Sequence, residues 1–168
     1  WGSWPARFVS IEDGKISPSR NWHDDHLVGF PSMNGMAKSL AQGLNIATKT
    51  NVEKMIVIDG QWQLYDDHKQ QLGLFDAVIL TAPVEQSRAL TPADCQFKSV
   101  LEQKKMKSCF TLMLGFDKNP VTEFDAAFVK DEILSWISVN SSKPGRNTKP
   151  SIVINSTNRW ADKHLDEN

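Results

Sequence analysis

The sequence lacks the patterns that identify several common classes of protein. Its two cysteines, Cys95 and Cys109, have neither CxxC spacing nor neighbouring histidines. We expect both to be reduced, packed thiols, and a disulfide is the less favoured alternative. No apolar run is long enough to span a bilayer, and no charged-then-apolar leader opens the chain. These absences favour a cytoplasmic protein without a membrane partner.

The sequence also lacks an excess of charge of either sign. Lys and Arg number 19 and Asp and Glu number 20, which gives a formal net charge of -1. Such a balance excludes a broad positive field, so we expect no nucleic-acid partner. The 168 residues, of which 40% are hydrophobic, can form one domain or two small lobes that share a core. Because the first residue is Trp1 and not Met, we expect a piece of a longer protein.

Local catalytic motifs are absent as well. The sequence contains no GxSxG, HExxH, GxxxxGK[ST] or GxGxxG pattern, so serine hydrolase, zincin, P-loop and dinucleotide-fingerprint chemistry have no local support. The run from His23 to His26, His-Asp-Asp-His, contains metal-ligand residue types. It has no third or fourth ligand in register, however, and an exposed polar loop is the favoured interpretation. We predict no metal site.

The stretch from Phe75 to Gln86, Phe-Asp-Ala-Val-Ile-Leu-Thr-Ala-Pro-Val-Glu-Gln, joins an apolar run to a polar end. Ala77–Leu80 is expected to form a strand covered on both faces, and Pro83 ends it by removing an N–H donor. Glu85–Leu90 is expected to be helical. Ligands collect at the carboxyl ends of strands in α/β layers. A buried strand without any ligand is the equal alternative.

Apolar periodicity and turn residues predict the other elements. Strands are expected at 6–11, 15–17, 45–49, 52–59, 61–65, 108–116, 126–129, 134–139 and 151–155. Helices are expected at 34–42, 93–103 and 157–165. Ser32 is a candidate cap and Gly43 a stop for the first helix, and Asp59-Gly60 suits a tight hairpin turn. The order predicts an α+β fold with an antiparallel-rich mixed β-sheet and few helices.

The run from Asn140 to Arg146, Asn-Ser-Ser-Lys-Pro-Gly-Arg, places two cations on a turn after a strand that carries Trp136. Such a turn can hold an anionic, partly planar ligand. The alternative is an ordinary solvated turn, which these residues by themselves favour.

Four stretches in succession resemble the bacterial renalase-like, FAD-dependent amine-oxidase-type flavoproteins. They are Trp-Pro-Ala-Arg-Phe (4–8), Val-Gly-Phe-Pro-Ser-Met-Asn-Gly-Met-Ala (28–37), the stretch 75–86, and Leu-Ser-Trp-Ile-Ser-Val-Asn-Ser-Ser-Lys-Pro-Gly-Arg (134–146). The resemblance follows nearly the whole chain in order. Residues 140–146 are its most specific part, whereas the strand ending in Ala-Pro is shared with many flavoproteins.

In that family an amino-terminal βαβ unit with the Gly-rich fingerprint holds the FAD pyrophosphate, and a carboxy-terminal segment closes over the flavin. Neither is recognisable here, so the resemblance implies a fragment from the middle of the enzyme that is inactive alone and does not carry FAD. It implies a substrate-domain hairpin and loop at 1–28, a part of the FAD-binding lobe at 29–90, and a substrate-domain sheet and helix at 91–168.

The resemblance also implies site residues. The backbone of Val52 corresponds to the position that meets the adenine ring, and the strand end at residues 81–83 passes the cofactor. The implied cofactor-binding residues are Val52, Thr81, Ala82 and Pro83. The implied substrate-binding residues are Trp136, Asn140, Lys143 and Arg146. No catalytic residue is assigned.

The implied activity of the whole enzyme is hydride transfer from a small reduced substrate, such as a dihydronicotinamide dinucleotide, to flavin and then to oxygen. Two alternatives stay open. One is a cofactor-free β-rich binding or self-association domain, in which an apolar patch around Val78, Leu80 and Met36 forms a homodimer through the exposed FAD-lobe face. The other is a flavin enzyme that oxidises an amine or a polyene.

Overall fold

The computed structural model describes residues 1–19, 26–146 and 149–167. The chain divides into two compact units. Unit 1 contains Trp1–Leu44 and Lys107–Asn168, and unit 2 contains Asn45–Met106. The sequence-based boundaries at residues 28 and 90 differ from these, and the assignment of segments to a substrate lobe and an FAD lobe stays a prediction.

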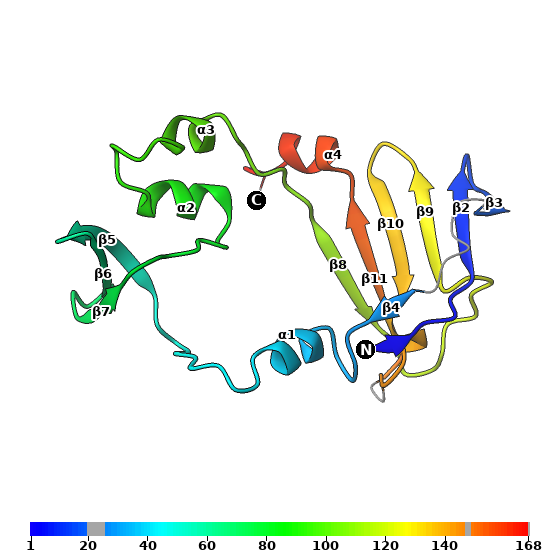
Figure 1. Cartoon of the computed structure of the whole chain (residues 1–168). Coiled ribbons are helices and arrows are strands. Elements are labelled where there is room, and N and C mark those ends of the chain that lie inside the picture. Colours follow the sequence, from blue (N-terminus) through cyan, green and yellow to red (C-terminus); the bar gives the residue numbers. More distant parts are fainter. Residues whose placement is uncertain (20–25, 147–148, 168) are drawn as a thin grey trace. The chain divides into compact units, whose positions relative to one another are not determined.

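Unit 1 is built on a six-stranded mixed sheet with the order β3-β2-β9-β10-β11-β8 (Figure 1). Four of the five neighbouring pairs are antiparallel, and β2 and β9 are parallel. The strands are β2 (Phe8–Glu12), β3 (Lys15–Pro18), β8 (Thr111–Gly115), β9 (Ala126–Lys130), β10 (Leu134–Val139) and β11 (Ser151–Ser156). The predicted antiparallel-rich mixed sheet with few helices is confirmed.

The hairpin between β2 and β3 turns at Asp13 and Gly14, with φ angles of 50° and 72°. Positive φ at both central residues matches the right-handed twist of the flanking strands, so local turn chemistry places this hairpin correctly. A second, two-stranded sheet pairs β1 (Gly2–Ser3) with β4 (Leu27–Val28).

The core of unit 1 lies at the centre of the large sheet. Val9 of β2 pairs with Ala127 of β9, which in turn pairs with Ile137 of β10. Ala126 and Ala127 are fully buried. Every residue of β8, at the edge, is exposed, and these include the apolar Met113.

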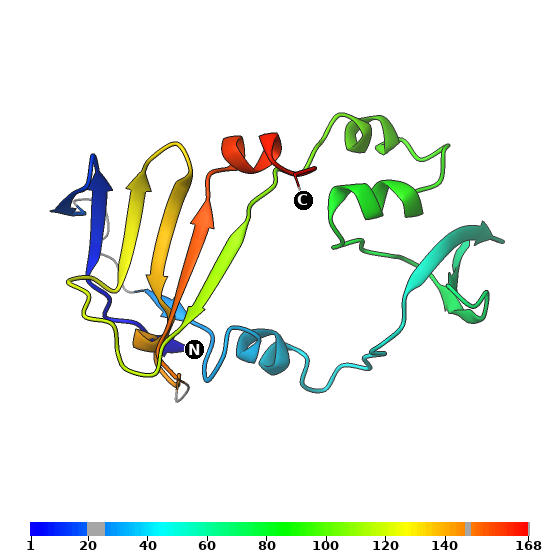
Figure 2. The same ribbon diagram turned by 180° about the vertical axis from the view of Figure 1, so that it is seen from behind.

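Short helices complete unit 1: α1 (Gly35–Leu40), the 3-10 turn η1 (Asn140–Ser142) and α4 (Asn158–Lys163). Thr157 caps α4 by accepting a hydrogen bond from the Trp160 amide at 3.2 Å. Figure 2, from behind, shows α4 directly after β11. The predicted cap of the first helix is wrong, because Asn34 is the N-cap residue and Ser32 instead donates its hydroxyl to the Asn34 side chain. Gly43 follows with a φ of 79°.

Unit 2 contains an antiparallel meander of β5 (Val52–Ile58), β6 (Gln61–Asp66) and β7 (Gln71–Phe75). Asp59 and Gly60 have φ angles of 48° and 80°, as the predicted hairpin turn requires. The second turn is held by Asp66, whose carboxylate accepts from the amides of His68 and Gln70 at 3.0 and 2.7 Å.

Three predicted elements of unit 2 are wrong or shortened. The strand at 45–49 does not form, and Ala77–Leu80 lies outside every strand. A strand needs a hydrogen-bonded neighbour, and the described residues supply none beside 77–80. The helix expected at 93–103 is only α3 (Lys98–Glu102), whereas α2 (Val84–Leu90) begins one residue before its prediction.

Helices α2 and α3 cap each other. Lys98 of α3 donates to the carbonyls of Arg88 and, at 2.7 Å, Thr91 at the end of α2. Arg88 of α2 donates to the carbonyls of Leu101 and Lys104 at 3.0 and 2.7 Å. Carbonyl groups at both carboxyl ends are therefore satisfied by side chains of the other helix. In the described part of the chain, no helix has the length and apolar character needed to cross a membrane.

Candidate functional site

A pocket of about 540 Å³ in unit 2 brings together residues that the sequence placed at the cofactor. Val52, Thr81 and Ala82 line it, whereas Pro83 does not and is the N-cap residue of α2. We call this hollow the strand-end pocket. Its lining residues are Asn51, Val52, Glu53, Ile79, Leu80, Thr81, Ala82, Gln86, Ala89 and Leu90.

The start of β5 forms one wall of the strand-end pocket. β5 is the outer strand of the meander, so only β6 pairs with it among the described residues. The register shifts between Val52 and Lys54, which leaves Val52 paired with Asp66 at the end of the ladder. The outer backbone edge of β5 therefore keeps N–H and C=O groups that a ligand can reach.

The opposite wall is fixed by Ser87. This buried residue donates its hydroxyl to the Ala82 carbonyl at 2.8 Å, and its amide donates to the Pro83 carbonyl at 2.9 Å. Both bonds tie the extended segment to the first turn of α2. Nothing in the sequence pattern singled out Ser87, because its role depends on the bend at Pro83.

The chemistry of the strand-end pocket suits an uncharged planar ring. Apolar side chains form much of the lining, and Asn51, Thr81 and Gln86 add neutral amides and a hydroxyl. Among its described lining residues, Glu53 is the one charged group and no cation is present. The residues therefore fit the adenine end of FAD through apolar contact and amide groups, and they do not fit its pyrophosphate.

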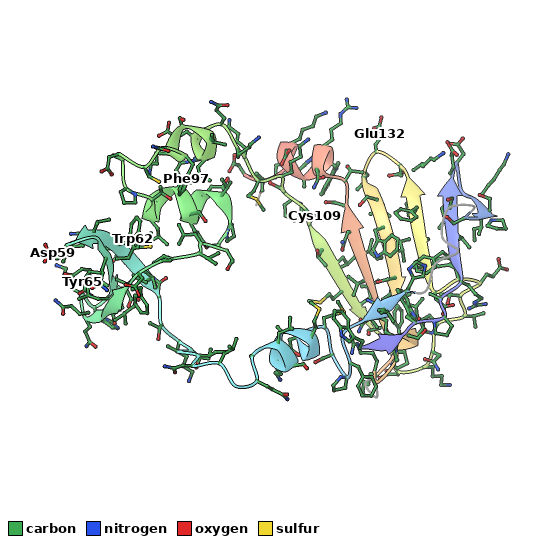
Figure 3. All side chains as sticks on the ribbon, in the orientation of Figure 1. Asp59, Trp62, Tyr65, Phe97, Cys109 and Glu132 are labelled. Atoms are coloured by element: carbon green, nitrogen blue, oxygen red, sulfur yellow. The ribbon has the colours of Figure 1, made fainter. Side chains whose placement is uncertain are left out.

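A second pocket of about 460 Å³ borders the same segment, since Ile79, Leu80 and Ala82 line both. Trp62 and Phe97, labelled in Figure 3, belong to its lining, as does Cys95. Val78 and Leu80 are half-buried, and the large exposed apolar residue of the segment is Ile79, at 88%. The patch around Val78, Leu80 and Met36 stays a prediction.

In unit 1, the run 140–146 folds against the amino-terminal segment. The Ser142 hydroxyl donates to the Val139 carbonyl at 2.9 Å and accepts from the Trp4 indole N–H at 3.0 Å. Trp4 is buried, and the Lys143 ammonium lies 5.2 Å from the centre of its ring. Lys143 thus already makes a cation–π contact within the chain.

Arg146 also has partners within the chain. Its guanidinium donates to the carbonyl of Pro31 and, at 3.3 Å, to that of Gly29. Gly145 between the two cations has a φ of 75°, and a Cβ there would lie 2.6 Å from the Phe30 ring. Glycine is required at this position, and the loop closes tightly on residues 29–31.

Two ionisable groups near this loop have shifted pKa values. Partial burial, with a smaller effect from Arg146, lowers the pKa of Lys143. Burial alone would raise the pKa of the Asp125 carboxyl, but hydrogen bonds and charge from Arg7, with a smaller bond from Ser142, hold that pKa below its usual range. The Arg7 guanidinium lies 3.0 Å from the Asp125 carboxylate.

The other two predicted substrate residues, Trp136 and Asn140, also have partners within the chain. The Trp136 ring packs edge-on against Phe128 at 4.8 Å and is 6.2 Å from Phe8, in an aromatic cluster on β2, β9 and β10. The Asn140 amide donates to the Ser151 hydroxyl at 3.4 Å. The structure therefore brings Lys143 and Arg146 onto one turn, and it places Trp136 in a packed cluster.

The predictions for the two cysteines and for the His23–His26 run have different outcomes. Both thiols are free, Cys95 is half-buried, and Cys109 is exposed just before β8, so the prediction of a packed Cys109 is wrong (Figure 3). Of the His23–His26 run, residues 23–25 lie outside the described residues, and the His26 ring lies 4.2 Å from Phe8. Within residues 1–19, 26–146 and 149–167, no group of three ligand-type side chains could hold a metal ion.

No known family model matches this sequence. The architecture nevertheless corresponds to part of a flavin amine-oxidase-type fold. One similar structure is a protein of Exiguobacterium sp. 255-15 that has been assigned as a protoporphyrinogen oxidase, with 21% identity, a TM-score of 0.56 and 74% of this chain covered. Another is a triple mutant of putrescine oxidase redesigned in cofactor binding, with 12% identity, a TM-score of 0.57 and 80% of this chain covered.

A double mutant of the same oxidase gives 12% identity, a TM-score of 0.58 and 81% coverage of this chain. The chain spans only 29% of the length of the Exiguobacterium protein and 30% of that of each putrescine oxidase variant. At these identities the likeness shows the fold alone.

Proposed function

We propose that this chain is part of an FAD-dependent oxidoreductase, in which the strand-end pocket holds the adenine end of FAD. The observation that carries the proposal is the convergence of Val52, Thr81 and Ala82 on one pocket, in a fold shared with redox enzymes. When bound, FAD would accept hydride from the substrate and pass the electrons on. Because the pocket lacks cations, the pyrophosphate requires protein groups from elsewhere.

The proposal can be tested with the purified chain by fluorescence anisotropy of FAD, with FMN as the matched ligand that lacks adenosine. We expect the chain to bind FAD and not FMN, and to release FAD on desalting because the pyrophosphate is not held. Replacing Ala82, which lines the pocket, by tryptophan should weaken FAD binding at least about tenfold by filling the pocket.

The control is Ala77→Trp, because Ala77 is exposed on the same segment and is not a lining residue of the pocket. It should bind FAD as the wild type does. Equal binding of FAD and FMN, or unchanged FAD binding by Ala82→Trp, would remove the adenine role from this pocket.

For the whole enzyme we propose a reduced substrate that carries phosphate, such as a dihydronicotinamide dinucleotide. Support comes from Lys143 and Arg146 on one turn, because a guanidinium has five N–H donors and its bonds to two carbonyls leave donors for an anion. We further propose that the chain alone is inactive. Its two free thiols support a cytoplasmic location.

An amine substrate is the second candidate of this class, and the putrescine oxidase neighbours favour it. The two candidates differ in the sign of one effect. In the full-length enzyme, replacing both Lys143 and Arg146 by methionine should raise KM for a phosphate-bearing substrate. The same change should leave or lower KM for a cationic amine, because it removes like charge.

A candidate of a different class is self-association through residues 77–81. This segment alternates exposed and half-buried residues, with Ile79 exposed, and no strand pairs with it among the described residues. No charged residue occurs between Ala77 and Val84. An uncharged, unpaired extended segment is a template for strand pairing, and we propose a second copy of the chain as its partner.

Sedimentation velocity over a range of chain concentrations tests this candidate. The wild type should dimerise, and Ile79→Lys should remain monomeric because its charge opposes pairing. Ile133→Lys is the control, since Ile133 is exposed at 47% in the turn before β10. A monomeric wild type, or equal loss of dimer in both variants, would contradict self-association at residues 77–81.

A further inference from the structure

The second pocket of unit 2, of about 460 Å³, has no part in the function proposed above. We call it the α2–α3 pocket, because residues of both helices and of their connection line it, together with Met55 of β5 and Trp62 of β6. All of its described lining residues belong to unit 2. Its volume lies within the range of sites for small organic molecules, so it is large enough to be a ligand site by itself.

None of the described residues that line the α2–α3 pocket carries a charge. The cations Arg88 of α2 and Lys98 of α3 are not lining residues, because both donate to backbone carbonyls at the ends of the two helices. An ionised ligand would lose water in this pocket and find no counter-ion, and the burial of an unpaired charge is costly. The lining therefore selects an uncharged ligand.

Two buried hydroxyl groups in the lining, those of Ser87 and Thr91, already donate their protons within the chain. The Ser87 hydroxyl donates to the Ala82 carbonyl at 2.8 Å, and the Thr91 hydroxyl donates to the Ser87 carbonyl at 2.7 Å. Each hydroxyl oxygen still has lone pairs that can accept a hydrogen bond. A carboxylate therefore finds no hydroxyl proton in this pocket, whereas an N–H group of a ligand still finds an acceptor.

Aromatic rings and a thioether give the α2–α3 pocket its second preference. Trp62 and Phe97, both labelled in Figure 3, contribute rings, and the buried Met55 contributes a thioether. Aromatic rings pack favourably against each other edge-on or with an offset, and methionine sulfur makes favourable contacts with the edge of a ring. These groups favour a flat aromatic ligand over an aliphatic one.

We propose that the α2–α3 pocket binds an uncharged aromatic molecule. The rings of the ligand contact Trp62, Phe97 and Met55, and the absence of charged lining groups excludes ionised analogues. This inference does not rest on FAD binding, because the ligand class follows from the α2–α3 pocket alone. If the chain binds such a molecule and does not bind FAD, the present inference stands and only the adenine role of the strand-end pocket fails.

Isothermal titration of the purified chain with indole tests the proposal. Indole is flat, uncharged and carries one N–H, while indole-3-acetate and tryptamine add a negative and a positive charge to the same ring system. We expect indole to bind with a Kd below about 1 mM, and both charged analogues to bind at least about fivefold more weakly. The proposal is overturned if indole does not bind, or if either analogue falls short of that difference.

A pair of variants tests whether the aromatic lining holds the ligand. Phe97→Ala should fold, because Phe97 is exposed, and it should weaken indole binding about 2- to 10-fold by removing one ring contact. Phe75→Ala is the control, because Phe75 is also exposed, lies at the end of β7 and is not a lining residue of this pocket. It should bind indole as the wild type does. Equal indole affinities of the two variants would overturn the assignment of this pocket.

The two free cysteines report where indole binds. Cys95 lines the α2–α3 pocket, whereas Cys109 is exposed in unit 1. Indole at about ten times its Kd should slow the alkylation of Cys95 by N-ethylmaleimide at least about threefold, because bound ligand covers that thiol. Mass spectrometry of the two cysteine peptides measures both rates, and the rate at Cys109 should not change. An unchanged rate at Cys95, or equal slowing of both thiols, would overturn the proposed site.

Discussion

The two regions that the sequence singled out differ in where their polar groups find partners. In the run 140–146 of unit 1, Ser142 bonds Trp4, Arg146 bonds two backbone carbonyls, and Lys143 lies against an indole ring. In the strand-end pocket of unit 2, Asn51 and Gln86 make no hydrogen bond through their side chains to other described residues. One region is satisfied internally, and the other is open.

This difference separates structural roles from binding roles. Lys143 and Arg146 already have partners within the chain, so their positions are accounted for without any ligand. A substrate role for them requires hydrogen-bond donors in addition to those already used. The amides of Asn51 and Gln86 are exposed and have no partner among the described residues, so their donors and acceptors are open to solvent or to a ligand. An uncharged ligand can therefore gain both contact area and hydrogen bonds in unit 2.

The strongest test of the internally satisfied region is Trp4→Ala. It removes a buried ring, the hydrogen bond to Ser142 and the surface on which Lys143 lies, so we expect unit 1 to lose about 3 to 5 kcal/mol of unfolding free energy. Urea denaturation followed by tryptophan fluorescence measures the loss. Trp1→Ala is the control, because Trp1 is 73% exposed and its loss should change stability by less than about 0.5 kcal/mol.

A direct comparison of the two regions uses one change in each. Arg146→Met should destabilise unit 1 by about 0.5 to 1.5 kcal/mol, because it removes the donor to the carbonyls of Gly29 and Pro31, of which Pro31 is exposed to water. Gln86→Met should stay within about 0.5 kcal/mol of wild type, because Gln86 is exposed. Equal effects on the denaturation midpoint would erase the distinction between the regions.

Local turn chemistry explains which parts of the fold were predictable. The hairpins at Asp13-Gly14 and Asp59-Gly60 depend on residues adjacent in sequence, and both form between strands that the sequence predicts. The strand at 77–80 fails because a strand also needs a neighbour, and a single sequence does not show which segment lies beside it. The partial burial of Val78 and Leu80 still follows the apolar pattern.

The candidate site was predictable only in part, for a related reason. The family resemblance assigned Val52 and Thr81 to the binding of one cofactor, and both residues line one pocket. Glu53 and Gln86 were not predicted as lining residues, because their place in the pocket depends on the approach of α2 to the edge of β5. Likewise, Arg146 binds carbonyls 115 and 117 residues earlier in the chain, a contact that no spacing rule predicts.

A smaller test of the satisfied region is the acid stability of the Asp125 pair with Arg7. The pKa of Asp125 is lowered in the folded state, so its stabilising effect is present above the ordinary pKa of about 4 and is lost as the pH falls through the lowered pKa. Solvent screens the pair because the Arg7 side chain is 62% exposed. We therefore expect Asp125→Asn to cost only about 0.5 to 1 kcal/mol at pH 7.

Acid titration of the denaturation midpoint checks this expectation. The difference between wild type and Asp125→Asn should shrink as the pH falls below the ordinary pKa of an Asp and vanish below the lowered pKa of Asp125, where both side chains are uncharged. Asp117→Asn is the control, because Asp117 pairs with Lys149 but its side chain is 94% exposed. A loss of similar size in this control would mean that the Asp125 pair gains nothing from its partial burial.

Lys143→Met has the smallest expected effect on the free energy of unfolding. The sign of this effect shows whether the charge of Lys143 stabilises or destabilises the loop. Burial lowers the pKa of Lys143, so the charged form opposes folding, while the Trp4 ring attracts it. These effects oppose each other, and we expect a change within about 0.5 kcal/mol at pH 7.

As the pH rises through the lowered pKa towards the unfolded value of about 10.4, wild type should gain stability relative to Lys143→Met. Chemical denaturation between neutral and alkaline pH measures this difference. A loss above about 1 kcal/mol at pH 7 that shrinks with rising pH would show that the charge stabilises the loop.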